Sequence, residues 1–136
     1  MILVSSADHG LSFHSKVLHP WSTNVCPMSS EAFAEGPSGL VASWESAERV
    51  YFSRINPDTL EAAPPIAAPG RPAARKHPSL AVNSAGETIL VWAEGTGWAR
   101  GGALAWQVFD AGGQPTAEHG RLSEGIPVWN DRTSPA

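Results

Sequence analysis

The sequence predicts an all-β fold. The 13 glycines and 12 prolines among 136 residues interrupt the chain too often for long helices. Short apolar runs of about five residues recur instead, roughly every ten residues, with turn residues between them. This spacing is typical of an antiparallel meander. The expected strands are residues 1–5 (MILVS), 39–44 (GLVASW), 50–55 (VYFSRI), 88–92 (TILVW) and 103–109 (ALAWQVF), and residues 30–35 (SEAFAE) are the one segment expected to form a helical turn.

Composition excludes several classes of protein. The formal net charge of −4 argues against binding of nucleic acid or an anionic membrane through bulk charge. The single cysteine, Cys26, excludes a disulfide within the chain, and we expect it to be buried and inert. No stretch approaches the roughly 20 apolar residues that a membrane helix needs.

A repeat of about 50 residues runs through the chain. Pro27, Pro78 and Pro127 each begin a strand segment, at intervals of 51 and 49 residues. Between them Trp44 aligns with Trp92, and we expect both to be core residues. In the following strand Phe52 aligns with Trp106. Four short strands per 50 residues is the spacing of a β-propeller blade.

The repeat divides the chain into blade-like units. Residues 1–20 form half a blade, 26–68 and 77–122 form whole blades, and 126–136 begin another. About 2.5–3 four-stranded blades cannot close a ring, because propellers have at least about four. The sequence therefore predicts a partial β-propeller, either part of a larger ring or a chain that self-associates through its open strand edges.

The most specific motif is the first turn, residues 6–13 (SADHGLSF), which fits the pattern S-x-D-x-G-x-[ST]-[WF]. Gly10 permits a positive φ in the tight turn, and Asp8 accepts hydrogen bonds from its backbone. Phe13 is expected to pack between blades, while Ser6 opens the motif. The pattern resembles the Asp box, or BNR repeat, of the sialidase (neuraminidase) superfamily. Remnants follow at residues 56–59 (NPDT) and 110–113 (DAGG).

Residues 77–129 are similar to the closing blades of bacterial sialidase-like propellers, which have six blades. The resemblance implies hydrolysis of terminal sialic acid by three arginines, a Tyr–Glu nucleophile pair and an Asp acid/base. None of the arginines lies in a motif that matches the triad, and Tyr51, the only tyrosine, is expected to be a packing residue. Catalytic residues therefore stay unassigned. Whether the protein is an enzyme is left open: exo-sialidase activity would require the completed propeller.

In this fold the Asp-box turns lie away from the active site, so the opposite loops form the working face. Those loops are residues 18–28, 44–50, 69–77, 92–103 and 121–127. Indole rings stack on sugars and arginines pair with carboxylates, which suits an acidic or hydroxyl-rich ligand. The candidate ligand-binding residues are Arg75, His77, Glu94, Trp98, Arg100 and Glu45. Three of them have an alternative role that involves no ligand: a solvated loop charge at residue 75, a strand-start residue at 77 and an indole folded over its own loop at 98.

Other chemistries find no support in the sequence. The glycines at 95, 97, 101 and 102 precede a strand rather than a helix, so they form no phosphate site. The five histidines lack metal-ligand spacing. We expect no cofactor, metal, nucleic acid or membrane partner. The expected function is that of a sialidase-like, glycan-acting propeller. The alternatives are a noncatalytic glycan- or protein-binding module and a structural fragment that assembles through open blade edges. Proteins of this family are often secreted or periplasmic, but the opening residues lack a signal peptide, so the compartment is unassigned.

Overall fold

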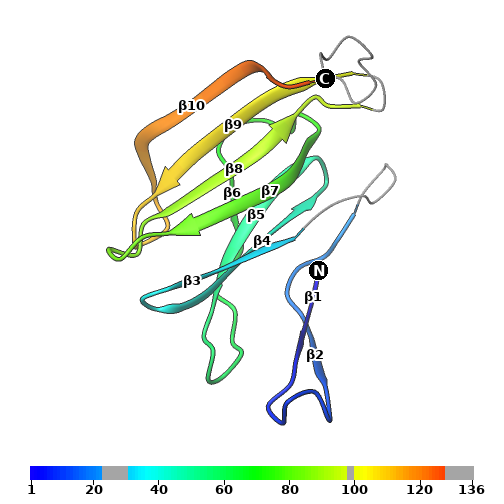
Figure 1. Ribbon diagram of the computed structural model, residues 1–136, viewed down its shortest axis with the longest axis vertical. Helices are drawn as coiled ribbons and strands as arrows, with labels where there is room; N and C mark the ends of the chain where they lie inside the picture. The colour runs from blue at the N-terminus through cyan, green and yellow to red at the C-terminus, as the bar shows by residue number, and fades with distance from the viewer. Residues whose placement is uncertain (23–30, 98–99, 128–136) are drawn as a thin grey trace, which may run out of the picture.

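The structure, a computed structural model, describes residues 1–22, 31–97 and 100–127. These residues form three antiparallel sheets of two, four and four strands, and no helix occurs among them (Figure 1). The all-β prediction is therefore confirmed. The expected helical turn is wrong, because residues 32–36 form a strand in which side chains alternate between half-buried and exposed. In the part of the chain that the structure describes, no helix is long and apolar enough to cross a membrane.

The first sheet is a hairpin of β1 (Ile2–Ser5) and β2 (His14–Val17). The middle sheet contains β3 (Ala32–Gly36), β4 (Gly39–Ser46), β5 (Arg49–Ile55) and the short β6 (Ile66–Ala67). Its strands lie side by side in chain order, as an antiparallel meander requires.

The C-terminal sheet is a second meander of the same order, β7 (Arg75–Val82), β8 (Thr88–Glu94), β9 (Gly102–Phe109) and β10 (Pro115–Ile126). Ile126 pairs with Gly102 and ends β10, so it does not begin a new strand as the repeat predicts. Any strand of a further unit would lie beyond it, largely outside the described residues.

The middle sheet is covered on both faces, which explains why β4 is buried at every position from residue 41 to 46. Val41, Val50 and Phe52 face the C-terminal sheet, where they meet Leu90 and Trp92. On the opposite face, Trp44, Ala42 and Tyr51 pack against Met1, Leu3 and Leu18 of the hairpin segment. The C-terminal sheet thus lies against one face of the middle sheet, and the hairpin segment packs on the other face (Figure 1).

The two four-stranded sheets repeat each other position by position. Trp44 lies opposite Tyr51, and Trp92 lies opposite Ala105, each on the second and third strands of its sheet. Both tryptophans are buried against the preceding sheet, so their prediction as core residues is confirmed. One position further along the third strand, Phe52 and Trp106 point the other way.

Antiparallel strands place the connections at two opposite ends of the stack. The loop end carries residues 47–48, 68–74, 95–97 and 100–101. The turn end carries residues 6–13, 37–38, 56–65, 83–87 and 110–114. The Asp-box turn and the candidate ligand-binding loops therefore lie at opposite ends, as the resemblance implies.

Candidate ligand-binding surface at the loop end

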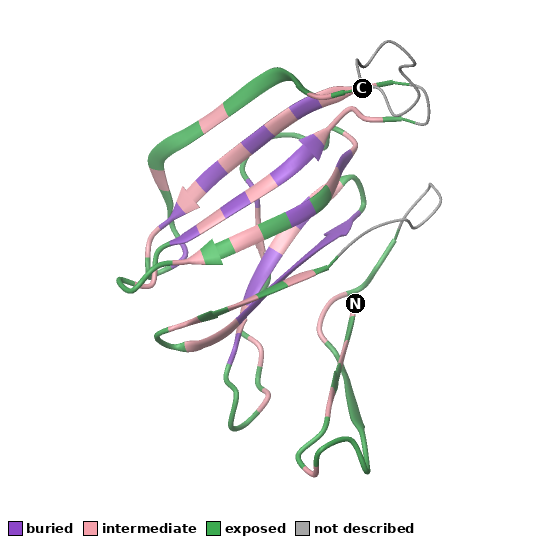
Figure 2. Cartoon of the chain, in the orientation of Figure 1, coloured by how far each residue is buried: buried purple, intermediate pink, exposed green. Residues whose placement is uncertain are grey.

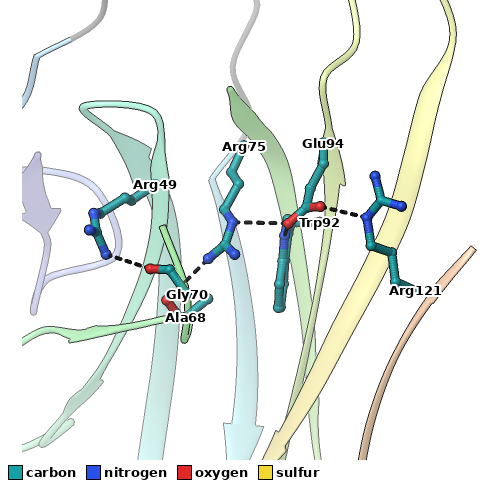
Figure 3. Close-up of polar contacts among 7 residues, drawn as sticks. All are labelled: Arg49, Ala68, Gly70, Arg75, Trp92, Glu94 and Arg121. Atoms are coloured by element: carbon teal, nitrogen blue, oxygen red, sulfur yellow. Dashed lines mark hydrogen bonds and ion pairs between the residues drawn. The ribbon is translucent and has the colours of Figure 1, made fainter. Parts of the chain in front are cut away.

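A buried ion-pair network joins the strands of the C-terminal sheet at the loop end (Figure 3). Strand register sets Arg75, the first residue of β7, opposite Glu94, the last residue of β8. Arg75 Nε lies 3.0 Å from Glu94 Oε1, and their side chains are only 7% and 11% exposed. Trp92 Nε1 donates to the same carboxylate oxygen at 2.8 Å. Arg121 Nε donates to the other oxygen, Oε2, at 2.9 Å.

Arg75 is committed to this network. Its Nη1 donates to the carbonyl of Ala68 at 3.1 Å, and its guanidinium lies 5.0 Å from the centre of the Trp92 ring. Gly70 lies close enough that a β-carbon there would stand 2.9 Å from Arg75 Nη2. Arg75 is therefore neither a solvated loop charge nor an arginine free to bind a ligand. It fixes the 68–74 loop to the sheet.

Glu94 is held in its ionised form. Burial opposes ionisation, but hydrogen bonds from Trp92 and Arg121, together with the charges of Arg75 and Arg121, outweigh it. The pKa of the Glu94 carboxyl consequently lies below its usual value of 4.5. A carboxylate held this way is a poor proton donor near neutral pH.

Glu45 and His77 meet across the interface between the two large sheets. Glu45 Oε2 accepts a hydrogen bond from the backbone N–H of His77 at 3.2 Å, and Glu45 itself is buried. His77 lies at the irregularity in β7 between Lys76 and Ser79, where its φ of 51° is left-handed. His77 therefore lies at a bulge within β7 and not at the strand start, which was the alternative role given for it. Its side chain is exposed.

The remaining two candidates differ in what the structure describes. Arg100 is exposed and forms a β-bridge with Gly97 at the neck of the 95–101 loop. Trp98 lies outside the described residues, as does Cys26. Of the six candidates, Glu45, Arg75 and Glu94 are structural residues whose charged groups bond within the protein, and Arg100 and His77 are exposed to solvent.

Three arginines at this end, Arg49, Arg71 and Arg121, were not among the sequence candidates, and two of them are anchored by hydrogen bonds. Arg121 is 53% exposed while its Nε is anchored to Glu94, and Arg49 Nη1 donates to the carbonyl of Gly70 at 3.2 Å. Arg121 lies opposite Ala105, which lies opposite Trp92. Strand alternation therefore places Arg121 on the same face of the sheet as Trp92, but this can be worked out only when the β9–β10 register is known.

Four of the six described non-glycine residues with left-handed backbone lie at the loop end, and the other two, His9 and Leu60, lie at the turn end. Ala47 and Glu48 have φ values of 50° and 62° and form a two-residue hairpin loop, a place where Asn-Gly is favoured. Ala74 and His77 also lie in the left-handed region. Residues with β-carbons adopt this conformation at a cost, and such residues cluster at functional sites. The Glu48 carbonyl accepts hydrogen bonds from the backbone N–H groups of Ala73 at 3.4 Å and Arg75 at 3.2 Å, which join two of these loops.

Tyr51 packs inside the stack, as the sequence predicts. Its ring stacks on Trp44 with centroids 6.2 Å apart and lies 4.7 Å from the His19 ring. His19 Nδ1 in turn accepts a hydrogen bond from Trp44 Nε1 at 3.2 Å. Burial lowers the pKa of His19, so this ring stays neutral at pH 7. Tyr51 is thus a packing residue between the hairpin segment and the middle sheet.

At the opposite end, the Asp-box turn is closed by its own side chains. Asp8 accepts hydrogen bonds from the Ser12 hydroxyl at 2.6 Å, the Ser12 backbone N–H at 2.9 Å and the Ser6 hydroxyl at 2.8 Å. Gly10 has a φ of 87° and donates its N–H to Ser6 Oγ. Phe13 was expected between blades, but it is 64% exposed beside Gly10. The turn is therefore stabilised by hydrogen bonds rather than by the aromatic ring.

Asparagine and aspartate hold the other long turns of this end in the same way. In each, a side-chain oxygen accepts a hydrogen bond from the backbone N–H three or four residues later, a local bond that Asn and Asp side chains form readily in turns. The remnants seen in the sequence at 56–59 and 110–113 are two of these turns. The pairs are Asn56 with Thr59 at 3.0 Å, Asn83 with Glu87 at 3.0 Å and Asp110 with Gln114 at 2.8 Å.

The Asp8 turn leads to a pH prediction. Hydrogen bonds, foremost that from the Ser12 hydroxyl, lower the pKa of Asp8 from 3.8 to about 2. Since the folded pKa is depressed, the stabilisation from ionised Asp8 is complete above pH 3.8 and is lost as the pH falls through about 2. We expect Ser12→Ala to move the pKa back toward 3.8. Carboxyl ¹³C NMR titration measures this, with Ser15→Ala as the control, and an unchanged midpoint in Ser12→Ala would contradict it.

A small hollow at the turn end lies between the two large sheets. Residues 36–41 line one side, and Val82, Gly86 and Ala111 line the other. Its one charged side chain, Arg54, donates to the carbonyls of Asp110 at 3.2 Å and Gly86 at 3.4 Å. The hollow is therefore a gap where the two sheets meet, and its one charged side chain, Arg54, is already hydrogen-bonded within the protein.

Comparisons with known proteins add no assignment. No protein-family model matches the chain, and no match was found among curated proteins or solved structures. Within residues 1–22, 31–97 and 100–127, no group of three or more His, Cys, Asp or Glu residues is placed to hold a metal ion.

Proposed function

We propose that this chain is part of a sialidase-like β-propeller that binds acidic glycans at its loop end without hydrolysing them. The observation that carries the proposal is that some charged groups at this end are bonded within the protein while others reach the surface. Glu45, Arg75 and Glu94 are bonded within the protein with little exposure, whereas other cationic side chains at this end reach the surface. Arg71, Arg100 and Arg121 are exposed, and Arg49 and Lys76 are half-buried.

The stacking of the sheets supports the propeller assignment. Two meanders of equal strand order lie face to face, and each carries a tryptophan at the same position. In addition, β7, the first strand of the C-terminal sheet, contacts three strands of the middle sheet. Blades of a propeller pack in this manner, each covering the face of the one before.

Charge distribution supports an acidic ligand. Arg54 and Lys16 are the basic residues placed at the turn end, whereas six of the nine Lys and Arg residues lie at the loop end. Among the described residues, Lys and Arg therefore outnumber Asp and Glu at the loop end, where the acidic residues are Glu31, Glu45, Glu48, Glu94 and Glu124. Guanidinium groups bind planar carboxylates through two parallel hydrogen bonds, and a sialic acid carries such a carboxylate.

The buried groups favour binding over catalysis. Glu94 is held ionised, so it is unsuited to protonate a leaving group near neutral pH. The Tyr51 ring is packed against His19 and Trp44 between the hairpin segment and the middle sheet. Arg75 has its guanidinium occupied by Glu94 and Ala68. These groups position the loops and leave ligand contact to the exposed arginines.

The proposal is tested by binding of sialylated and desialylated forms of one glycan, measured by calorimetry. We expect binding of the sialylated form only, weakened by added salt. Arg100→Ala should reduce the affinity about tenfold or more, since a hydrogen-bonded ion pair contributes about 1.5–3 kcal/mol. Lys16→Ala removes the same charge at the turn end and is the matched control.

Two results would overturn this function. Equal affinity for both glycan forms, or equal losses in Arg100→Ala and Lys16→Ala, would show that the loop end does not recognise the carboxylate. Turnover of a fluorogenic sialoside by the folded protein would replace the binding proposal with sialidase activity.

A further inference from the structure

The C-terminal sheet has one apolar face that nothing in the described structure covers. Along β8 and β9, buried residues alternate with half-buried ones (Figure 2). The buried residues Leu90, Trp92 and Phe109 pack toward the middle sheet, so the half-buried ones lie on the other side. Strand register places a leucine of β10, 54% exposed, on the same side. We call this surface the outer face, and its residues are Ile89, Val91, Leu104, Trp106, Val108 and Leu122.

The same positions of the middle sheet are covered by a neighbouring sheet. Alignment of Trp44 with Trp92 makes Val41 equivalent to Ile89, and Phe52 equivalent to Trp106. Val41 and Phe52 are buried against the C-terminal sheet, whereas Ile89 and Trp106 are only half-buried. The repeat therefore points to another sheet on the outer face.

The hairpin at the other end of the stack carries the complementary surface. Leu3 of β1 packs toward Trp44 of the middle sheet. The alternate residues Ile2, Val4 and Val17 point away from it and are 60%, 58% and 70% exposed. Ile2 and Val17 are direct partners across the hairpin, so these side chains form one continuous apolar strip.

We propose that a second copy of this chain covers the outer face through its hairpin strip. Within the chain, the hairpin packs against the middle sheet and the middle sheet packs against the C-terminal sheet. The hairpin strip of one copy, placed on the outer face of another copy, would continue this order of packing. The contact joins two different surfaces, and such contacts either close into a ring or extend into a filament.

Ring size favours closure with two copies. Each copy supplies three stacked sheets, so two copies supply six. Propellers of about four to eight blades are stable rings. The closed dimer contains the same contact twice and leaves neither apolar surface exposed. This inference depends on the stacking of sheets and not on glycan binding, so either proposal can fail without the other.

Analytical ultracentrifugation of the unmodified chain tests the proposal. We expect a species of twice the 14.3 kDa chain mass. Val17→Glu places a charge in the hairpin strip, and Val91→Lys places one in the outer face. Each should give folded monomers, with folding checked by circular dichroism. Leu11→Glu adds the same charge to the exposed turn of the hairpin and should leave the dimer intact.

Mixing the two variants distinguishes head-to-tail contact from other dimers. Val17→Glu keeps its outer face and Val91→Lys keeps its hairpin strip, so an equimolar mixture should regain a dimer through that one intact contact. If Val91→Lys does not fold, Leu122→Lys carries the same test. A monomer at all concentrations, a dimer insensitive to Val17→Glu, or a mixture that stays monomeric would overturn the proposal.

Discussion

Glu94→Ala is expected to destabilise the protein by about 3–5 kcal/mol, because it leaves the buried guanidinium of Arg75 without its anion. The substitution also removes the acceptor of Trp92 Nε1 and the anchor of Arg121. Since small domains are stable by only about 5–15 kcal/mol, a large part of the fold stability would be lost. Urea unfolding followed by tryptophan fluorescence measures the change.

Arg121→Ala is the matched control for this network. Arg121 contacts the same carboxylate but is half-exposed, so its loss should cost about 0.2–1 kcal/mol. Equal costs for Glu94→Ala and Arg121→Ala would show that Arg75 is not left unpaired.

The same network makes stability depend on pH. Because the pKa of Glu94 is lowered in the folded state, the stabilisation from its charge is present above its usual value of 4.5 and is lost as the pH falls through its lowered value.

The stack is held at each end by polar contacts that cross between sheets. At the loop end Glu45 accepts from the backbone of His77. At the turn end Arg54 donates to the carbonyl of Asp110. Together with the apolar core between them, these contacts fix the loops of both sheets on one rigid base. A binding surface built in this way needs little ordering when it meets a ligand.

Local pattern predicted the strands because the information is local. Alternation and turn residues located β4, β5, β8 and β9 to within a few residues, and the equivalence of Trp44 and Trp92 predicted two core positions. The segment 32–36 was ambiguous, since a short apolar run fits one helical turn as well as an edge strand. Pairing with β4 across residues 39–43 decided the strand.

The roles of the candidate site residues could not be predicted in the same way. Glu45, Arg75 and Glu94 are charged residues in loop-flanking positions, which usually indicates solvent exposure. Their burial depends on β7 and β8 register and on how the two sheets stack, neither of which is encoded locally. The bulge at His77 likewise follows from its backbone contact with Glu45 on another sheet. Long-range pairing thus gives three of the candidates, Glu45, Arg75 and Glu94, a structural role.

Phe52→Ala is expected to cost about 3–5 kcal/mol, the second large loss of stability in this protein. Phe52 is fully buried between the middle and C-terminal sheets, where its ring lies 4.7 Å from that of Phe109 at a tilt of 58°. Truncation removes this contact and leaves a cavity at the interface that the rigid sheets cannot collapse to fill. Thermal and urea unfolding both measure the loss.

Phe33→Ala provides the control on the same sheet, because Phe33 is 53% exposed on the edge strand β3 and its removal should cost well under 1 kcal/mol. The pair isolates the energy of the sheet–sheet interface from that of an aromatic residue in a strand. A loss in Phe52→Ala no larger than in Phe33→Ala would mean that the two sheets are not tightly stacked in solution. The loops would then lack a common base, and Arg49 and Arg100, which come from different sheets, would not be held together to bind one ligand.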